Sequence, residues 1–172
     1  MTEALPFTMA YYFRTLTRIL AEPRRFFLEL KETNGFRKPI AFLVVSSVIF
    51  TLASMIVATP SEPLKAIVIY LVNAMGMSFI TMVLGYLTMV TIFSKRVSFS
   101  RLFTIYSLAS GVTLLVSWVP YFIWFTEPWK WWIIGSGLVN ACGFRWYQAL
   151  VIIAVTLFIM ISSFLALFST FF

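Results

Sequence analysis

The chain contains two long apolar runs joined by a short basic turn. Residues 66–92 carry no charged side chain, and residues 102–125 carry none either. Between them stand Lys95, Arg96 and Arg101, with no acidic residue. A helix over residues 66–92 would be about 40 Å long, which exceeds the roughly 30 Å hydrocarbon core of a bilayer. The pattern therefore predicts a transmembrane helical hairpin whose basic turn stays on the cytoplasmic side.

The composition extends this prediction to the whole chain. Of its 172 residues, 61% are hydrophobic and only 11% are charged, which is more apolar surface than a soluble domain of this size can bury. We therefore expect an all-α fold, a polytopic membrane helical bundle. Residues 1–38 are expected to form a cytoplasmic region, and residues 39–172 a membrane domain of five transmembrane segments. These segments are residues 39–58, 66–92, 102–125, 129–142 and 146–172.

The N-terminal region has the pattern of one or two amphipathic helices. In residues 6–20, apolar side chains recur at helical spacing with arginines between them, and a second segment begins with a proline. We expect Arg24, Arg25, Phe26 and Phe27 to lie on a membrane-surface helix. Packing of the same helix against the cytoplasmic ends of the spans is an equally good interpretation, and the two are compatible.

The basic residues predict the topology. With five spans, only Lys65 and Lys130 of the 13 Lys and Arg residues fall on the side opposite the N-terminus. Lys and Arg are enriched in cytoplasmic loops, so we expect a cytoplasmic N-terminus. Residues 129–142 are ambiguous, because a helix of that length measures about 21 Å and is either a short span or a re-entrant helix. The side of the C-terminus depends on which it is.

Aromatic residues gather around the end of the third expected span. Clusters of this kind are typical of a belt at the membrane interface, and Pro120 within this one is expected to bend the helix end. The expected belt comprises Trp118, Tyr121, Phe122, Trp124, Phe125, Trp129, Trp131 and Trp132.

The chain has few side chains that could carry chemistry. It lacks histidine and aspartate and has one cysteine, Cys142, which is either a palmitoylation site or an ordinary residue at a helix end. Its glutamates lie in the N-terminal region or, as Glu62 and Glu127, in expected short loops. Catalytic triads, metal centres and proton relays need residues that are missing here. We therefore expect a protein that is not an enzyme, with no cofactor, no metal and no nucleic-acid partner.

Small and polar residues recur within the second, third and fourth expected spans. In lipid such residues let helices approach closely and form hydrogen bonds between them. They also serve to line a polar pathway, so both interpretations stay open, with packing the simpler one. The candidates for polar packing or a pathway are Asn73, Thr81, Gly85, Tyr86, Ser107, Gly135, Gly137 and Asn140.

Three stretches carry a family resemblance. The first runs from Pro-Arg-Arg-Phe-Phe at 23–27 to Gly-Phe-Arg-Lys-Pro-Ile-Ala-Phe at 35–42. The second is Ser-Phe-Ser-Arg-Leu-Phe at 98–103, and the third is Cys-Gly-Phe-Arg-Trp at 142–146. Their order and spacing resemble those of bacterial members of the Yip-one domain family. The resemblance implies a five-span helical protein of the bacterial cytoplasmic (inner) membrane with a cytoplasmic N-terminus.

The resemblance lends no enzymatic activity. Eukaryotic relatives bind prenylated Rab GTPases and are linked to vesicle budding and membrane shaping. This chain lacks their long cytosolic domain and their acidic-Tyr-Gly-Pro pattern, so Rab binding is not carried over. A proline expected in the third span of many bacterial relatives is replaced by Ser110 and Gly111.

Two functions fit these observations. The first is a non-enzymatic membrane protein that organises membrane or recruits partners, with the lipid bilayer and either a homo-oligomer or another membrane protein as its partners. The alternative is a lipid or small-solute transporter, or a scramblase, with an uncharged polar pathway in spans two to four.

Overall fold

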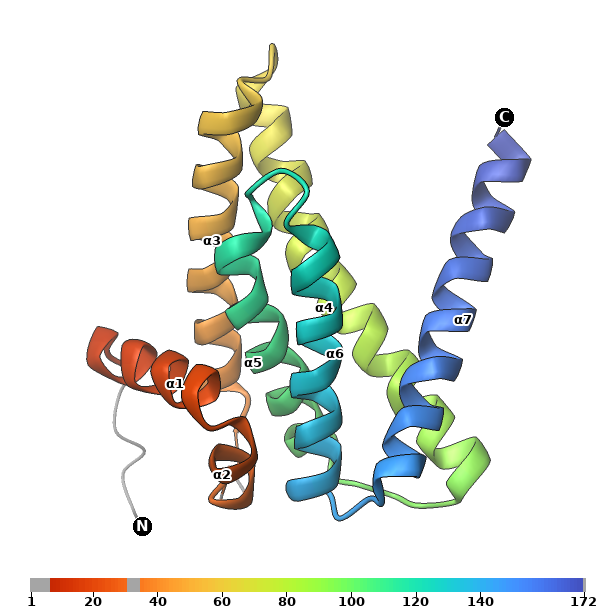
Figure 1. Ribbon diagram of the computed structural model, residues 1–172. Helices are drawn as coiled ribbons and strands as arrows, with labels where there is room; N and C mark the ends of the chain where they lie inside the picture. Colours follow the sequence, from red (N-terminus) through yellow and green to blue (C-terminus); the bar gives the residue numbers. More distant parts are fainter. Residues whose placement is uncertain (1–6, 31–34, 172) are drawn as a thin grey trace.

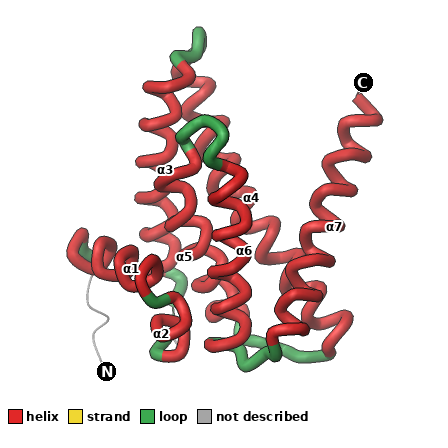
Figure 2. The backbone as a smooth tube through the Cα atoms, viewed as in Figure 1, coloured by secondary structure: helices red, strands yellow, loops and turns green. Residues whose placement is uncertain are grey.

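The computed structural model describes residues 7–30 and 35–171, and every regular element in this part of the chain is a helix. The parts of the expected N-terminal region and last span at 1–6, 31–34 and 172 lie outside the described residues. A short helix lies across a group of longer helices that run up and down (Figures 1 and 2). The helices are α1 (Met9–Ala21), α2 (Pro23–Leu28), α3 (Arg37–Ala58), α4 (Pro63–Phe93), α5 (Phe99–Ser117), α6 (Ile123–Asn140) and α7 (Trp146–Phe171).

Four of these helices are long and apolar enough to cross a membrane. They are Arg37–Ala58, Pro63–Phe93, Phe99–Ser117 and Trp146–Leu167. The prediction of an all-helical, multi-pass membrane protein is therefore confirmed. Helix α6 has 18 residues, or about 27 Å, and runs back beside α5, but it carries charged residues and Pro128. Length and hydropathy thus support four spans and leave the fifth undecided.

The sequence predicted a single helix over the uncharged run 102–125, but the structure has parts of two helices there. Helix α5 ends at Ser117, the chain turns through residues 118–122, and α6 begins at Ile123. Pro120 has no backbone N–H to continue a helix, and Tyr121 adopts a positive φ of 66°. The prediction was wrong because an apolar turn and an apolar helix have the same hydropathy. The fourth segment accordingly begins at residue 123 rather than at 129.

Helix α5 occupies the centre of the helix group. It contacts α3, α4 and α6, and all of residues 104–113 are buried. Two glycines allow close approach around it. A Cβ added to Gly111 would lie 2.7 Å from the Phe42 ring, and one added to Gly137 would lie 2.5 Å from Ile105. Small residues at such crossings are the usual means by which helices pack in a membrane.

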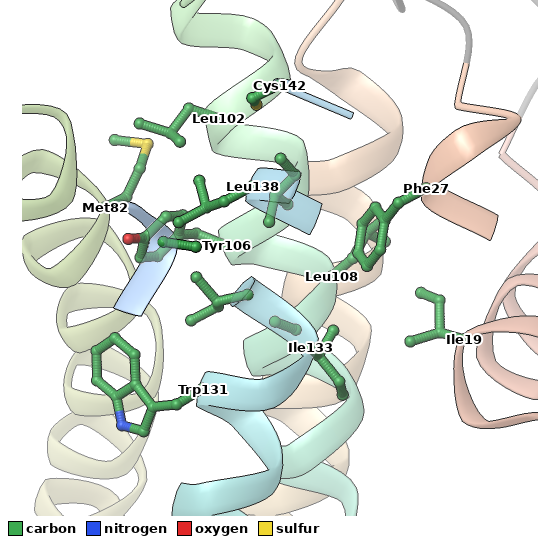
Figure 3. Packing of buried hydrophobic residues seen from close by; sticks show 14 of the residues in the cluster. Ile19, Phe27, Met82, Leu102, Tyr106, Leu108, Trp131, Ile133, Leu138 and Cys142 are labelled. Carbon is green, nitrogen blue, oxygen red and sulfur yellow. The ribbon is translucent and has the colours of Figure 1, made fainter. Parts of the chain in front are cut away.

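A third close approach joins α4 to α5. A Cβ on Gly85 would lie 2.2 Å from the Tyr106 hydroxyl oxygen, so only glycine leaves room for the phenol. Tyr106 is buried, and its side chain points from α5 toward Met82 (Figure 3). Within the described part of the chain, its hydroxyl has no hydrogen-bond partner.

Helix α2 is packed against the spans. Phe27 is fully buried and Phe26 is 9% exposed, and α2 contacts α6. In Figure 3, Phe27 points into the apolar cluster near Leu108 and Ile133. Of the two interpretations of this segment, packing against the bundle describes these two phenylalanines, which do not face lipid.

Ion pairs fix α1 to α2. The Glu29 carboxylate accepts hydrogen bonds from Arg18 on α1 and from Arg25 on α2. These bonds, with that from Arg18 the larger cause, hold the pKa of the Glu29 carboxyl below its usual value. A lowered pKa means that this contribution is present at neutral pH and is lost as the pH falls through that value.

Basic side chains from the turn after α4 and from the start of α5 bind the turn that follows α6. Lys95 Nζ donates to the Gly143 carbonyl at 2.8 Å, and an Arg101 guanidinium N–H donates to the Ala141 carbonyl at 3.0 Å. Both carbonyls lie just past the end of α6, where helix carbonyls lack partners within the helix. The turn between α4 and α5 and the turn between α6 and α7 therefore lie at the same end of the bundle (Figure 1).

Replacing Gly85 with alanine should destabilise the bundle by about 1–3 kcal/mol, because the new methyl group must displace Tyr106. Thermal unfolding in detergent measures the change. Gly76→Ala is the matched control on the same helix, since nothing lies within 4 Å of its added Cβ. Adding Tyr106→Phe to Gly85→Ala removes the nearest clashing atom and should restore part of the loss. Equal unfolding temperatures for the two glycine variants would contradict this packing.

Candidate functional site: a cavity lined by five helices

A cavity of about 380 Å³ lies among α4, α5, α6 and α7, with Phe50 of α3 also in its wall. Its volume is within the range of small-molecule and cofactor sites. Polar side chains from three helices converge on it, surrounded by apolar ones. Its lining comprises Phe50, Asn73, Ala74, Met77, Ser78, Thr81, Ser110, Thr113, Leu114, Ser117, Ile123, Glu127, Lys130, Met160 and Phe164.

An ion pair is the most polar part of this lining. Lys130 Nζ lies 2.5 Å from Glu127 Oε1, and the side chains are 16% and 42% exposed. Both residues belong to the first half of α6, where three-residue spacing puts them on one face. The sequence predicted Glu127 in a short loop, and this was wrong because α6 begins at Ile123, six residues before the expected start at 129.

The ion pair could have been found from the sequence. Glu127 and Lys130 have the i,i+3 spacing of a helical pair and flank Pro128. Reading them as helical required a helix that begins at Ile123, inside the uncharged run. The Pro128 nitrogen has no hydrogen to donate to the Trp124 carbonyl, so the helix is locally weakened beside the pair.

The hydroxyl groups of the lining donate to their own helices. Thr81 donates to the Met77 carbonyl at 2.8 Å, and Ser117 donates to the Thr113 carbonyl at 2.8 Å. Ser78 and Thr113 form similar bonds. With its hydrogen used in this way, each oxygen keeps lone pairs that can accept a hydrogen bond from a guest in the cavity.

Only two of the eight predicted pathway residues line the cavity, namely Asn73 and Thr81. Asn73 is exposed, and Thr81 is buried within its helix. Asn140 lies at the other end of α6, where its amide donates to the Ser136 carbonyl at 2.8 Å. Asn73 and Asn140 are therefore not brought together.

The other predicted pathway residues lie outside the lining of this cavity. Gly85 and Gly137 are the close approaches described above, and a Cβ on Gly135 would lie 3.3 Å from the Trp146 ring. Ser107 is buried within α5, and the Tyr86 ring lies 5.9 Å from that of Phe99.

The arginines of α2 have separate roles. The Arg24 guanidinium lies 5.6 Å from the Trp132 ring and 5.9 Å from the Trp146 ring, and these two rings are stacked at 5.3 Å. Trp132 was expected in the aromatic belt beyond the third span. It instead packs beside α2 and the start of α7, because α6 carries it back along the bundle. Arg25 forms ion pairs with Glu22 and Glu29.

The reactive groups outside the cavity offer no second site. Cys142 is buried, and burial raises the pKa of its thiol to about 11, although Arg101 and Lys95 oppose this shift. A buried, protonated thiol is a poor nucleophile, which favours the ordinary helix-end interpretation over palmitoylation. Within the described ranges, no group of three His, Cys, Asp or Glu side chains could hold a metal ion.

Comparison with models of known protein families gives a match. The family model described as the Yip1 domain matches residues 17–167. No curated protein and no solved structure matches the chain.

Removing one partner of the cavity ion pair should cost more than removing both. Glu127→Gln leaves the Lys130 ammonium mostly buried without its counter-charge, so we expect a loss of about 1–3 kcal/mol in the free energy of unfolding. Adding Lys130→Met should recover part of this loss. Unfolding in detergent measures both variants.

The matched control is Glu62→Gln with Lys65→Met. This pair has the same spacing but is exposed at the start of α4, so either change should cost about 0.5 kcal/mol or less. Additive effects at Glu127 and Lys130, with neither larger than the control, would show that the cavity pair is solvated and uncoupled.

Proposed function

The chain belongs to the Yip1 domain family, and on that premise we propose that it is a non-enzymatic protein that organises the membrane from its cytoplasmic face. In this proposal α6 is a fifth crossing and the N-terminus lies in the cytoplasm of a bacterium, with the protein in the inner membrane. The N-terminal helices α1 and α2 are the working part. They contact the lipid bilayer and present a surface to a second copy or to another membrane protein.

The observation that carries the proposal is that α1 has three faces. Tyr12, Thr15 and Ile19 are buried against the bundle. The Tyr12 and Ser46 hydroxyls are hydrogen-bonded at 2.9 Å, and the Tyr12 and Phe42 rings lie 4.6 Å apart, which fixes α1 to α3.

The second face of α1 is apolar and exposed. Met9, Phe13 and Leu20 are 61%, 59% and 48% exposed, and their spacing places them along one side of the helix. The third face carries Arg14 and Arg18 and lies on the opposite side. Because Arg18 binds Glu29 beside α2, the basic face is turned toward α2 and the apolar face away from it.

This arrangement suits a helix lying in the plane of the inner leaflet. Figure 1 shows α1 lying across the bundle, above α2 at the end that carries the basic turn. With that end in the cytoplasm, the apolar face points toward the acyl chains and the arginines toward the headgroups. The helix would fill space among the headgroups on one side of the bundle and so change the curvature or packing of the leaflet.

Charging the apolar face of α1 should abolish this effect without unfolding the bundle. Phe13→Glu with Leu20→Glu removes two exposed apolar side chains, each worth about 1.5–3 kcal/mol when fully buried in lipid. We expect the purified wild-type protein to partition into small, highly curved vesicles over large ones, and the variant to lose that preference.

The control places the same two charges next to the basic face of the same helix, as Ala10→Glu with Ala21→Glu. It should keep the curvature preference, since both positions are exposed and lie away from Met9, Phe13 and Leu20. Unaltered partitioning of the Phe13 and Leu20 variant would exclude α1 as the membrane-active part. Replacing Phe26 and Phe27 is not an equivalent test, because both are buried in the protein.

A second candidate function is transport or scrambling of a lipid or small solute through the cavity. The observation that favours it is the ion pair of Glu127 and Lys130 inside α6, since charged residues within a membrane helix usually mark a substrate or ion route. The sequence had suggested an uncharged pathway, whereas this route would be charged.

The two asparagines distinguish this candidate from simple packing. Asn73→Leu should reduce flux severalfold in proteoliposomes, because Asn73 lines the cavity. Asn140→Leu should leave flux unchanged, because Asn140 bonds to Ser136 at the far end of α6. Lipid scrambling and small-solute leak measured together would check this. Flux no greater than that of empty liposomes, from folded protein, would exclude transport.

A further inference from the structure

We infer that the cavity holds one zwitterionic phospholipid, with its headgroup at Glu127 and Lys130 and its acyl chains in the groove between α6 and α7. This inference shares its site with the transport candidate but is independent of α1, and lipid can bind there without being moved.

The charge of the cavity favours a zwitterion. Glu127 and Lys130 are the charged members of its described lining, so their charges cancel. Binding a ligand with a net charge would bury a charge without a counter-charge, and this carries a large free-energy cost. A headgroup that carries one ammonium and one phosphate adds no net charge and can pair with both side chains.

The hydrogen-bonding groups match the same headgroup. Glu127 and the hydroxyl oxygens of Thr81, Thr113 and Ser117 accept hydrogen bonds, as an ammonium needs. Lys130 and the Asn73 amide donate them, as a phosphate needs. Both sets converge on one cavity from α4, α5 and α6.

An apolar groove adjoins the polar cavity. It has a volume of about 530 Å³ and is lined by Ile123, Trp124, Glu127, Pro128, Trp131 and Leu157. Ile123 and Glu127 line both spaces, so the groove begins where the polar lining ends. A water-soluble zwitterion has no apolar part to occupy this groove, whereas a phospholipid has acyl chains that can.

The site opens toward the bilayer because α7 leaves the bundle. Ile152, Ile153 and Thr156 are buried in the first half of α7. From Phe158 onward, each residue of α7 whose burial is described is exposed, except the half-buried Met160. Figure 1 shows α7 diverging from α4 and α6 toward the C-terminus. A lipid can therefore enter sideways from the surrounding leaflet.

Native mass spectrometry of the full-length protein tests the inference. The probes are phosphatidylethanolamine and phosphatidylglycerol with identical acyl chains, added to delipidated protein in detergent. We expect phosphatidylethanolamine to be retained about tenfold more strongly, which is the usual effect of pairing one charged group. A photoreactive group on the acyl chain should cross-link to Trp131 or Leu157.

Four variants test the position of the site. Lys130→Met should lower phosphatidylethanolamine binding about tenfold. The reversed pair, Glu127→Lys with Lys130→Glu, keeps the cavity neutral and should retain most of the binding. Glu62→Gln with Lys65→Met, the exposed pair of equal spacing, should change nothing. If Lys130→Met fails to fold, Leu157→Trp fills the apolar groove while keeping the ion pair, and should lower binding of the lipid.

Four results would overturn the inference. Equal retention of phosphatidylglycerol would show that the site does not discriminate between headgroup charges. Full competition by glycerophosphoethanolamine, which has no acyl chains, would identify a site for a small solute. Unchanged binding in folded Lys130→Met and Leu157→Trp variants would place the lipid elsewhere. Cross-linking of α7 to a second copy across the groove, with lipid excluded, would make the groove an interface between subunits.

Discussion

Water is absent from the interior of a bilayer, so helices there gain little from the hydrophobic effect when they associate, and each polar group needs a partner within the protein. This constraint explains the position of α5. It packs against α3, α4 and α6, and its middle turns are buried. Gly85 of α4 and Gly137 of α6 let those helices approach side chains of α5, and Gly111 lets the α5 backbone approach Phe42 of α3. The cavity lies where α7 diverges from the helices packed around α5.

The same constraint explains how the end of the bundle that carries the basic turn is closed. The carbonyls after α6 cannot rely on the helix itself for partners, and Lys95 and Arg101 supply them. The positive charges that set the predicted orientation therefore also hold the turns together. Lys95 and Arg101 thus have a structural role besides their predicted effect on topology.

Hydropathy and charge were enough to predict an all-helical, multi-pass membrane protein. The stretches at residues 23–42, 98–103 and 142–146 indicated the family, and the family match over residues 17–167 confirms it. Hydropathy and charge could not place the turn at residues 118–122, since it is as apolar as the helices on either side. That one error moved Glu127 out of α6 and concealed the ion pair.

Pathway residues were harder to predict than the fold. Asn73 and Asn140 looked alike as buried amides, yet one lines a cavity and the other bonds to the preceding turn of its own helix. Glycine in a membrane helix likewise indicates a close approach without saying which neighbour approaches. Deciding between packing and a pathway requires the rotation of each helix about its axis, which the pattern of small residues in α4 to α6 does not determine.

The unequal lengths of the helices have a consequence for the surrounding bilayer. Helix α4 has 31 residues, or about 46 Å, whereas α6 has 18, or about 27 Å. In Figure 1 the turn between α3 and α4 stands higher than the turn between α5 and α6. With α6 as the proposed fifth crossing, a bilayer that matches the tall hairpin is too thick for the short one, and this mismatch favours local thinning there. On that proposal the membrane around the protein would be thinner on the side of α5 and α6 than on the side of α3 and α4.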